Sequence, residues 1–313
     1  MSDSRFPPEI EQKIFTYALK INSKQPNNLL LVARRVREWL LPIVWEVVVY
    51  QDPRLYEIPL DSILPLRQYG THIQHLLLSV DYKYIEPSNP DDYQIHPHQI
   101  FDSSLLLCPN ITNLALWWLE PPVSLQPLVN LSQLTHLSMD VNRILELIRD
   151  ERDIDSSGQT ESRTWYSTVQ AGDARPALFP NITHFDTRTA EWLGSRCHDN
   201  IPTLAIHFPK LTHLAHPRTQ WTTANTVVIR LSLKQFGGLE VLVWWKAMKK
   251  GEGSGVEEDL KEKPRVEDER LVLVLMSGNE EDWEREARGG GMGIWKLGDS
   301  VVEGRRKAKR VGN

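Results

Sequence analysis

A chain of 313 residues is long enough to build one large core or two modest ones. Its 41% hydrophobic and 25% charged content is typical of a soluble globular protein, and a net charge of −5 excludes a whole-molecule attraction to nucleic acid or anionic membranes. The longest apolar runs are far shorter than the roughly 18 residues that a membrane helix needs, and two cysteines provide no disulfide framework. Because the N-terminus also lacks a signal-peptide pattern, we expect an intracellular protein, cytoplasmic or nuclear.

Residues 8–19 are predicted to form the first helix. Pro7-Pro8-Glu9 suits a helix start, because proline fits the first turn and an acid is favoured at the positive end of the helix dipole. Apolar residues then recur at helical spacing. The polar stretch 22–28 contains Pro26 and is predicted to be a loop.

Two further helical pieces and a strand are predicted next. Asn28 is expected to cap a second helix that runs from Leu29 to about Leu41. Proline cannot continue a helix interior, so Pro42 is predicted to open a short third turn that ends at Trp45. The β-branched run Val47–Tyr50 predicts the first strand.

A short unit recurs along the rest of the chain. Clear copies stand at residues 110–114, 133–137, 181–185 and 210–214, with looser copies at 72–76 and 238–242. In each copy a turn is followed by alternating apolar residues, which predicts a short, half-buried strand. One such unit cannot bury its own apolar face, so the units are predicted to stack as a solenoid with short parallel strands. Their irregular spacing fits leucine-rich-type units of roughly 20–29 residues that carry insertions.

The chain is expected to divide into three parts. These are an N-terminal helical segment over residues 1–50, a repeat solenoid over 51–285, and a C-terminal cap with a basic tail over 286–313. Flexible insertions are predicted near 150–176 and 247–270, where polar, glycine and charged residues replace aliphatic ones. The continuous apolar run Leu271–Leu275 predicts a last strand that is covered on both faces. The basic run 305–310 suits either a nuclear localisation signal or a solvated chain end.

The N-terminal segment resembles the F-box. The residues that carry the resemblance are Phe6-Pro7-Pro8-Glu9-Ile10, Ile14-Phe15, Leu29-Leu30-Leu31-Val32-Ala33-Arg34-Arg35-Val36-Arg37-Glu38-Trp39, Pro42 and Trp45. The motif opens Leu-Pro-x-Glu-Leu/Ile, continues with Ile-Phe and later carries Val-Cys-(Lys/Arg)-x-Trp, a pattern from which Phe6, Ala33 and Val36 depart. As a whole, the chain is similar to F-box-like proteins of mushroom-forming fungi, which combine Leu-Leu-Val-Ala-x-Arg-Val with irregular Leu-Thr-His-Leu repeats.

This resemblance implies a substrate adaptor of a cullin-type E3 ubiquitin ligase. Its F-box helices would bind a Skp-type linker protein, and its repeats would hold a protein substrate. The residues at the linker-facing positions are Pro7, Pro8, Ile10, Ile14, Leu29, Leu30 and Val32.

The apolar residues of the helical segment have a second possible role. A unit of about forty residues is too small to be stable alone, so either a partner or the first repeat must cover it. In the second case the protein is a non-enzymatic scaffold whose F-box-like helices only cap the solenoid. Ile14, Phe15, Val36 and Trp39 are alternatively internal core of the unit, and for Trp39 we favour the core because large aromatic side chains dominate cores.

Histidines mark most of the repeats. The repeat-associated residues are His72, His75, His136, His184 and His213. Their shared position allows a ladder of rings, and the simpler interpretation is a repeated polar residue at the rim. A zinc site needs closely spaced ligands and a third partner, which neither this row nor His96-Pro97-His98 offers. Since nucleotide-binding and hydrolase motifs are also missing, we expect no metal, no cofactor and no enzymatic activity.

Tryptophan supplies the candidate substrate face. Eleven is a high number for this length, and two pairs of tryptophans fall at repeat strands. Because side chains alternate along a strand, one member of each pair should face outward, and an exposed tryptophan row would suit a protein partner. The candidates are Trp117, Trp118, Trp244 and Trp245. The alternative is that they pack under helices or at the ends of the solenoid.

Overall fold

The protein is an α/β structure built on a parallel sheet. The computed structural model describes residues 6–21, 26–51, 64–79, 105–117, 126–142, 144–145, 177–188, 197–217, 223–247, 266–276, 280–289 and 293–311. Within these ranges eight parallel strands pair in chain order, so each strand lies between its sequence neighbours. The strands are β1 (Val47–Gln51), β2 (His75–Ser79), β3 (Asn113–Trp117), β4 (His136–Met139), β5 (His184–Asp186), β6 (His213–Pro217), β7 (Val241–Ala247) and β8 (Leu271–Met276). The predicted α/β class and short parallel strands are confirmed.

The same hydrogen-bonded step joins most strands to the preceding one. At β5, the carbonyl of Thr135 accepts the backbone N–H groups of Thr183 and His184 at 2.9 and 3.1 Å, and the Thr183 hydroxyl at 3.3 Å. The carbonyls with this role are those of Glu46, Gln74, Thr112, Thr135, Thr183 and Thr212. A threonine hydroxyl of the next unit also donates to the carbonyls of Gln74, Thr112, Thr135 and Thr183. The repeated threonine therefore fixes the start of each strand.

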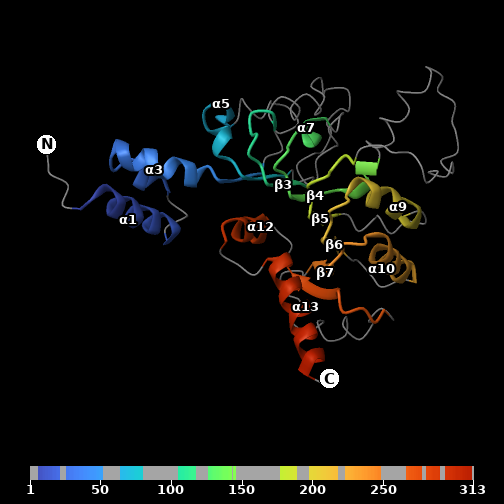
Figure 1. Cartoon of the computed structure of the whole chain (residues 1–313). Coiled ribbons are helices and arrows are strands. Elements are labelled where there is room, and N and C mark those ends of the chain that lie inside the picture. The colour runs from blue at the N-terminus through green and yellow to red at the C-terminus, as the bar shows by residue number, and fades with distance from the viewer. Residues whose placement is uncertain are drawn as a thin grey trace, which may run out of the picture.

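The outer face of the sheet carries the main core. One apolar anchor before each strand is buried, and these anchors are Ile73, Ile111, Leu134, Ile182, Leu211 and Leu239. Helices on this side supply the matching apolar residues: α5 (Leu66–Tyr69), α7 (Gln126–Val129), α9 (Cys197–His207) and α10 (Thr223–Gln235), with the 3-10 turn η2 (Gly70–His72) after α5. Figure 1 shows these helices along one side of a curved sheet. Phe179, Phe185 and Phe208 stack on one another within this core.

The inner face is covered by the C-terminal part of the chain. Helix α12 (Glu280–Ala287) packs Trp283 against the inner residues of β1, β2 and β3, and α13 (Ile294–Val311) packs on β7 and β8. In Figure 1 both helices lie on the side of the sheet opposite α9 and α10. A Cβ at Gly298 would stand 2.8 Å from Val241 Cγ1, so glycine allows α13 to approach β7 closely. The apolar strand predicted at 271–275 is thus covered on both faces, by the main core and by α13.

Three helices precede the sheet, but they are divided differently from the prediction. They are α1 (Pro8–Ile21), α2 (Pro26–Leu30) and α3 (Arg34–Val44). The expected helix from Leu29 to Leu41 is wrong, because the chain leaves the helical conformation before α3, where Ala33 is extended at φ −160° and ψ 153°. Pro42 does not open a new turn: the last turn of α3 continues past it, with Trp45 N donating to Leu41 O at 3.0 Å. Proline therefore removes one hydrogen bond near the end of the helix without stopping it.

Two predicted insertions fall mainly outside the part of the chain that the structure describes. Residues 150–176 lie outside it entirely, as do residues 248–265 of the second insertion. The described end of that insertion, at Asp268 and Arg270, is held by a salt bridge of 2.8 Å.

Gln74 interrupts the threonine series and provides a test of it. At this step the described residues offer no hydrogen-bond partner for the buried Nδ1 of His75, whereas the later repeat histidines bond to the preceding threonine. Gln74→Thr would place a hydroxyl where it can donate to Glu46 O and accept from His75. We expect the free energy of unfolding to rise by about 1 kcal/mol in chemical denaturation.

Gln74→Val is the matched control for this prediction. Valine has the branched shape of threonine without its hydroxyl, so it reports any gain that comes from shape alone. Equal stabilities of the two variants would contradict the role assigned to the hydroxyl.

Candidate functional site

The helices before the sheet leave an apolar surface open to solvent. Ile10, Ile14, Tyr17 and Ile21 recur along one side of α1, and their exposed fractions run from 41% to 68%. Phe6 before α1, and Leu31 and Val32 between α2 and α3, are also exposed. We call this set of seven residues the N-terminal apolar face. Its size is unusual, because large aliphatic side chains are seldom left exposed together.

The other side of these helices forms a small core of its own. Leu19, Val36 and Leu40 are buried, and Phe15, Leu29, Leu30 and Trp39 pack partly against them. An ion pair of 2.8 Å between Arg35 and Glu11 joins α3 to α1. This core lies apart from the main core, and Trp45 connects the two regions by stacking on Tyr69 with ring centres 4.8 Å apart.

The predicted linker-facing residues therefore separate into two groups. Pro7, Pro8, Ile10, Ile14 and Val32 are exposed. Leu29 and Leu30 are half-buried in the small core. Among the residues given the alternative role of internal core, Val36 is buried, Phe15 and Trp39 are half-buried, and Ile14 is exposed.

On the inner face of the sheet, histidines form a stacked row. The rings of His136 and His184 lie 4.0 Å apart, and those of His184 and His213 lie 4.1 Å apart, in nearly parallel planes. The register puts these residues opposite one another on β4, β5 and β6. The ladder considered from the sequence is therefore present, and its rings are half-buried or buried rather than at a solvated rim.

Threonine fixes the orientation of each ring in the row. Thr135 Oγ1 lies 2.9 Å from His136 Nδ1, with matching contacts of 2.8 and 2.7 Å at His184 and His213. Because the threonine hydroxyl already donates its proton to a backbone carbonyl, the histidine Nδ1 must donate to the hydroxyl. His136 and His184 thus carry their proton on Nδ1.

Two members of the row, His136 and His184, are held in the neutral form. Burial lowers the pKa of His136 to about 4 and that of His184 to about 2, and the neighbouring histidines lower both further. Within the described residues, no group of three or more His, Cys, Asp or Glu side chains is arranged so that it could hold a metal ion.

Helix α13 docks on this row. The Trp295 ring meets the rings of His184 and His213 edge-on, with centres 5.1 and 5.9 Å away. Asp299 Oδ1 lies 2.8 Å from His213 Nε2.

Glu286 links α12 to the start of α13. Its carboxylate accepts the backbone N–H groups of Ile294 and Trp295, in the space that a side chain at Gly293 would fill. Burial raises the pKa of Glu286 to about 7. The two helices are therefore tied together by a carboxylate at the positive end of α13.

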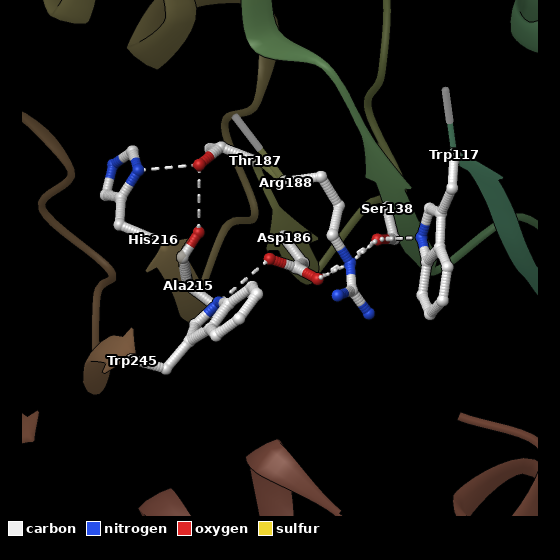
Figure 2. Close-up of polar contacts among 8 residues, drawn as sticks. All are labelled: Trp117, Ser138, Asp186, Thr187, Arg188, Ala215, His216 and Trp245. Atoms are coloured by element: carbon white, nitrogen blue, oxygen red, sulfur yellow. Dashed lines mark hydrogen bonds and ion pairs between the residues drawn. The ribbon is translucent and has the colours of Figure 1, made fainter. Parts of the chain in front are cut away.

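Beside the histidine row lies a buried polar cluster, shown in Figure 2. Asp186, at the end of β5, forms an ion pair of 2.8 Å with Arg188 Nε and accepts a hydrogen bond of 3.1 Å from Ser138 Oγ. Trp117 Nε1 donates to the same serine oxygen at 2.9 Å, and Trp245 Nε1 donates to Asp186 at 3.4 Å. Side chains from four strands therefore converge on one guanidinium.

Neighbouring Thr187 and His216 complete the polar residues drawn in Figure 2. The Thr187 hydroxyl donates to the carbonyl of Ala215 at 3.2 Å and lies 2.6 Å from His216 Nδ1. Burial lowers the pKa of His216 to about 3. This pair repeats the threonine–histidine contact of the row on the opposite face of the sheet.

The tryptophans differ from the expected exposed row. Trp244 is fully buried in the main core, and Trp117 and Trp245 are 3% and 5% exposed on the inner face. Alternation does send Trp244 and Trp245 to opposite faces, but each face has its own cover. Trp118 lies outside the described residues. The role of the four residues in binding a substrate stays a prediction, and the three described ones are buried.

Sequence reasoning missed several residues of this region. Asp186, Ser138 and Arg188 carry no motif, and Glu286 and Asp299 come from helices far along the chain. One signal was available for Ser138 and Asp186: both stand two residues after a repeat histidine, at the next inward-facing position.

Comparisons with known proteins add no identification. The chain matches no family model, no curated protein and no solved structure. Over the described residues, helices that are both long and apolar enough to cross a bilayer are absent.

The histidine row predicts a loss of stability in acid. Because the folded pKa of His136 lies near 4, below its ordinary value of 6.5, the contribution of this residue is complete above pH 6.5 and is lost as the pH falls toward 4. The full shift corresponds to about 3 kcal/mol. His136→Phe keeps an aromatic ring in the stack and cannot titrate, so its free energy of unfolding should fall less steeply between these pH values.

Comparing the wild type with His136→Phe also cancels the opposing effect of Glu286 on the pH dependence of stability. Its raised pKa makes its contribution largest in acid and reduces it as the pH rises through about 7, equally in both proteins. Denaturant unfolding at a series of pH values gives both slopes. Identical slopes would show that His136 is not held neutral by the fold.

Proposed function

We propose that this chain is a substrate-recruiting adaptor of a cullin-type E3 ubiquitin ligase. In this proposal α1, α2 and α3 form an F-box-like unit that binds a Skp-type linker protein. The strands and outer helices form an irregular leucine-rich-type solenoid that binds a protein substrate. The proposal implies an intracellular site of action, in the cytoplasm or nucleus, and assigns no catalytic residue to the chain.

The observation that carries the proposal is the N-terminal apolar face. Five of the seven residues that resemble linker-facing F-box positions are exposed, including Ile10, Ile14 and Val32. If these helices only capped the sheet, these side chains would be expected to pack against the first strands. Instead, the helices have a separate small core, and their apolar side is open.

A second feature supports a recognition role for the sheet. Consecutive parallel strands present a long inner surface assembled from many short units, which suits an extended partner better than a small substrate. Part of that surface is occupied by α12 and α13. A substrate would therefore use the surface around these helices or displace them.

Binding of purified linker to the full chain tests the proposal. Ile14→Asp should weaken linker binding about tenfold or more, because it removes a buried aliphatic contact and places a charge in the interface. Ile14 is 49% exposed, so the melting temperature should change little. Isothermal calorimetry and thermal unfolding measure the two quantities on the same preparations.

Val227→Asp is the matched control. Val227 lies on α10 with an exposed fraction of 43%, far along the chain from α1, and its change should leave linker binding intact. No binding of the linker by the intact wild-type chain would refute the proposal. A large loss of melting temperature in Ile14→Asp would instead favour the scaffold alternative, in which these helices act as a cap.

A further inference from the structure

We propose that Trp117, Trp245 and Asp186 form a binding site for an arginine side chain of the substrate protein, which the chain's own Arg188 fills in this structure. The inference rests on the proposed function, because it names what the inner face would recognise. The partner class is a protein segment that presents an arginine.

The geometry is that of a guanidinium site. The central carbon of the Arg188 guanidinium lies 3.5 Å from the centre of the Trp117 ring and 5.2 Å from that of Trp245. Asp186 Oδ2 lies 2.8 Å from Arg188 Nε. Two indole faces and a carboxylate are the groups that attract a flat, delocalised cation, and they suit guanidinium better than ammonium.

The walls of the site are tied together without Arg188. Ser138 Oγ accepts from Trp117 Nε1 and donates to Asp186, and Trp245 Nε1 donates to the other oxygen of that carboxylate. Figure 2 shows these bonds crossing from β3 through β4 and β5 to β7. Arg188 itself comes from the segment after β5, so the site is organised by the sheet and the guanidinium enters it from outside the sheet.

The surroundings carry surplus negative charge. Glu280, Asp282 and Glu286 of α12 all act on Arg188, in addition to Asp186. The nearby cation Arg285 pairs with Asp282 at 3.3 Å. Because the pKa of Glu286 is raised to about 7 and Lys296 acts on that carboxylate, the negative charge here comes mainly from the other three carboxylates, which favours a cationic ligand.

Arg188 is held there at a conformational cost. Its φ is 46°, and within the described residues no other non-glycine residue has a positive φ. That left-handed conformation is unfavourable for a residue with a Cβ. Its side chain is still 15% exposed. Arg188 is therefore a strained internal ligand, and an external arginine would compete with it for Asp186.

The test uses the full chain and the variant Arg188→Gly. Glycine accepts a φ of 46° without strain, and the change empties the site. The probes are the capped tripeptides acetyl-Gly-Arg-Gly-amide and acetyl-Gly-Lys-Gly-amide, titrated by calorimetry and by the indole N–H signals in NMR. We expect Arg188→Gly to bind the arginine peptide about tenfold or more tightly than the wild type, and both proteins to prefer it to the lysine peptide.

Two further variants show where binding occurs. Trp117→Leu in the Arg188→Gly chain should abolish the preference for arginine. Arg270→Gly is the matched control, because Arg270 is paired with Asp268 at 2.8 Å and, among the described residues, lies over no aromatic ring; it should give no gain in peptide binding.

The outcomes separate this inference from the proposed function. If the chain binds the linker but neither the wild type nor Arg188→Gly prefers the arginine peptide, the arginine site is refuted and the adaptor function stands. Arginine selectivity without linker binding would overturn the adaptor function and leave an arginine site. If Arg188→Gly does not fold, the wild-type titration decides. Indole signals that shift with the arginine peptide and not with the lysine peptide support the site. The absence of such shifts refutes it.

Discussion

The structure depends on a backbone carbonyl that accepts several donors from the next unit. At successive strands one such carbonyl receives two consecutive amide N–H groups, and at four of them a threonine hydroxyl as well. This contact sets the register of each strand pair, because it fixes which residue of the new strand lies opposite the start of the preceding strand. The contact also decides which face of the sheet each side chain occupies. The apolar anchor before the threonine packs in the main core on the outer face, and the residue after the threonine points to the inner face.

The character of the inner face follows from that step. Histidine after threonine yields a row of stacked rings, and burial disfavours the charged form of two of them, His136 and His184. Trp295 and Asp299 of α13 dock on this row, and Glu286 ties α13 to α12. Further along the strands, β5 supplies Asp186, and β3 and β7 supply the tryptophans around Arg188. The inner face thus combines polar pairs with apolar clusters under α12 and α13, whereas the N-terminal apolar face is exposed.

The sequence was most informative where one local signal dominates. The anchors, the strands and their parallel order follow from the repeat, because an alternating unit can bury its apolar side only by stacking. The helix break before α3 was missed, because Ala33 has no turn chemistry and its extended conformation therefore carries no local sequence signal. Alternation correctly separated Trp244 from Trp245, but both are buried rather than exposed, and the burial of Trp245 depends on a helix whose docking no local pattern predicts. Arg188 and Asp186 meet tryptophans far along the chain, a contact that becomes visible only once the register is known.

The proton positions on the histidine row test this account most directly. Long-range proton–nitrogen NMR on the full chain at neutral pH distinguishes protonation on Nδ1 from protonation on Nε2. If the threonine hydroxyls donate to the carbonyls, His136 and His184 must both carry their proton on Nδ1, the opposite of the form that free histidine prefers in water. Protonation of both residues on Nε2 would contradict the account, because the hydroxyl could then not hold the carbonyl and orient the ring at the same time.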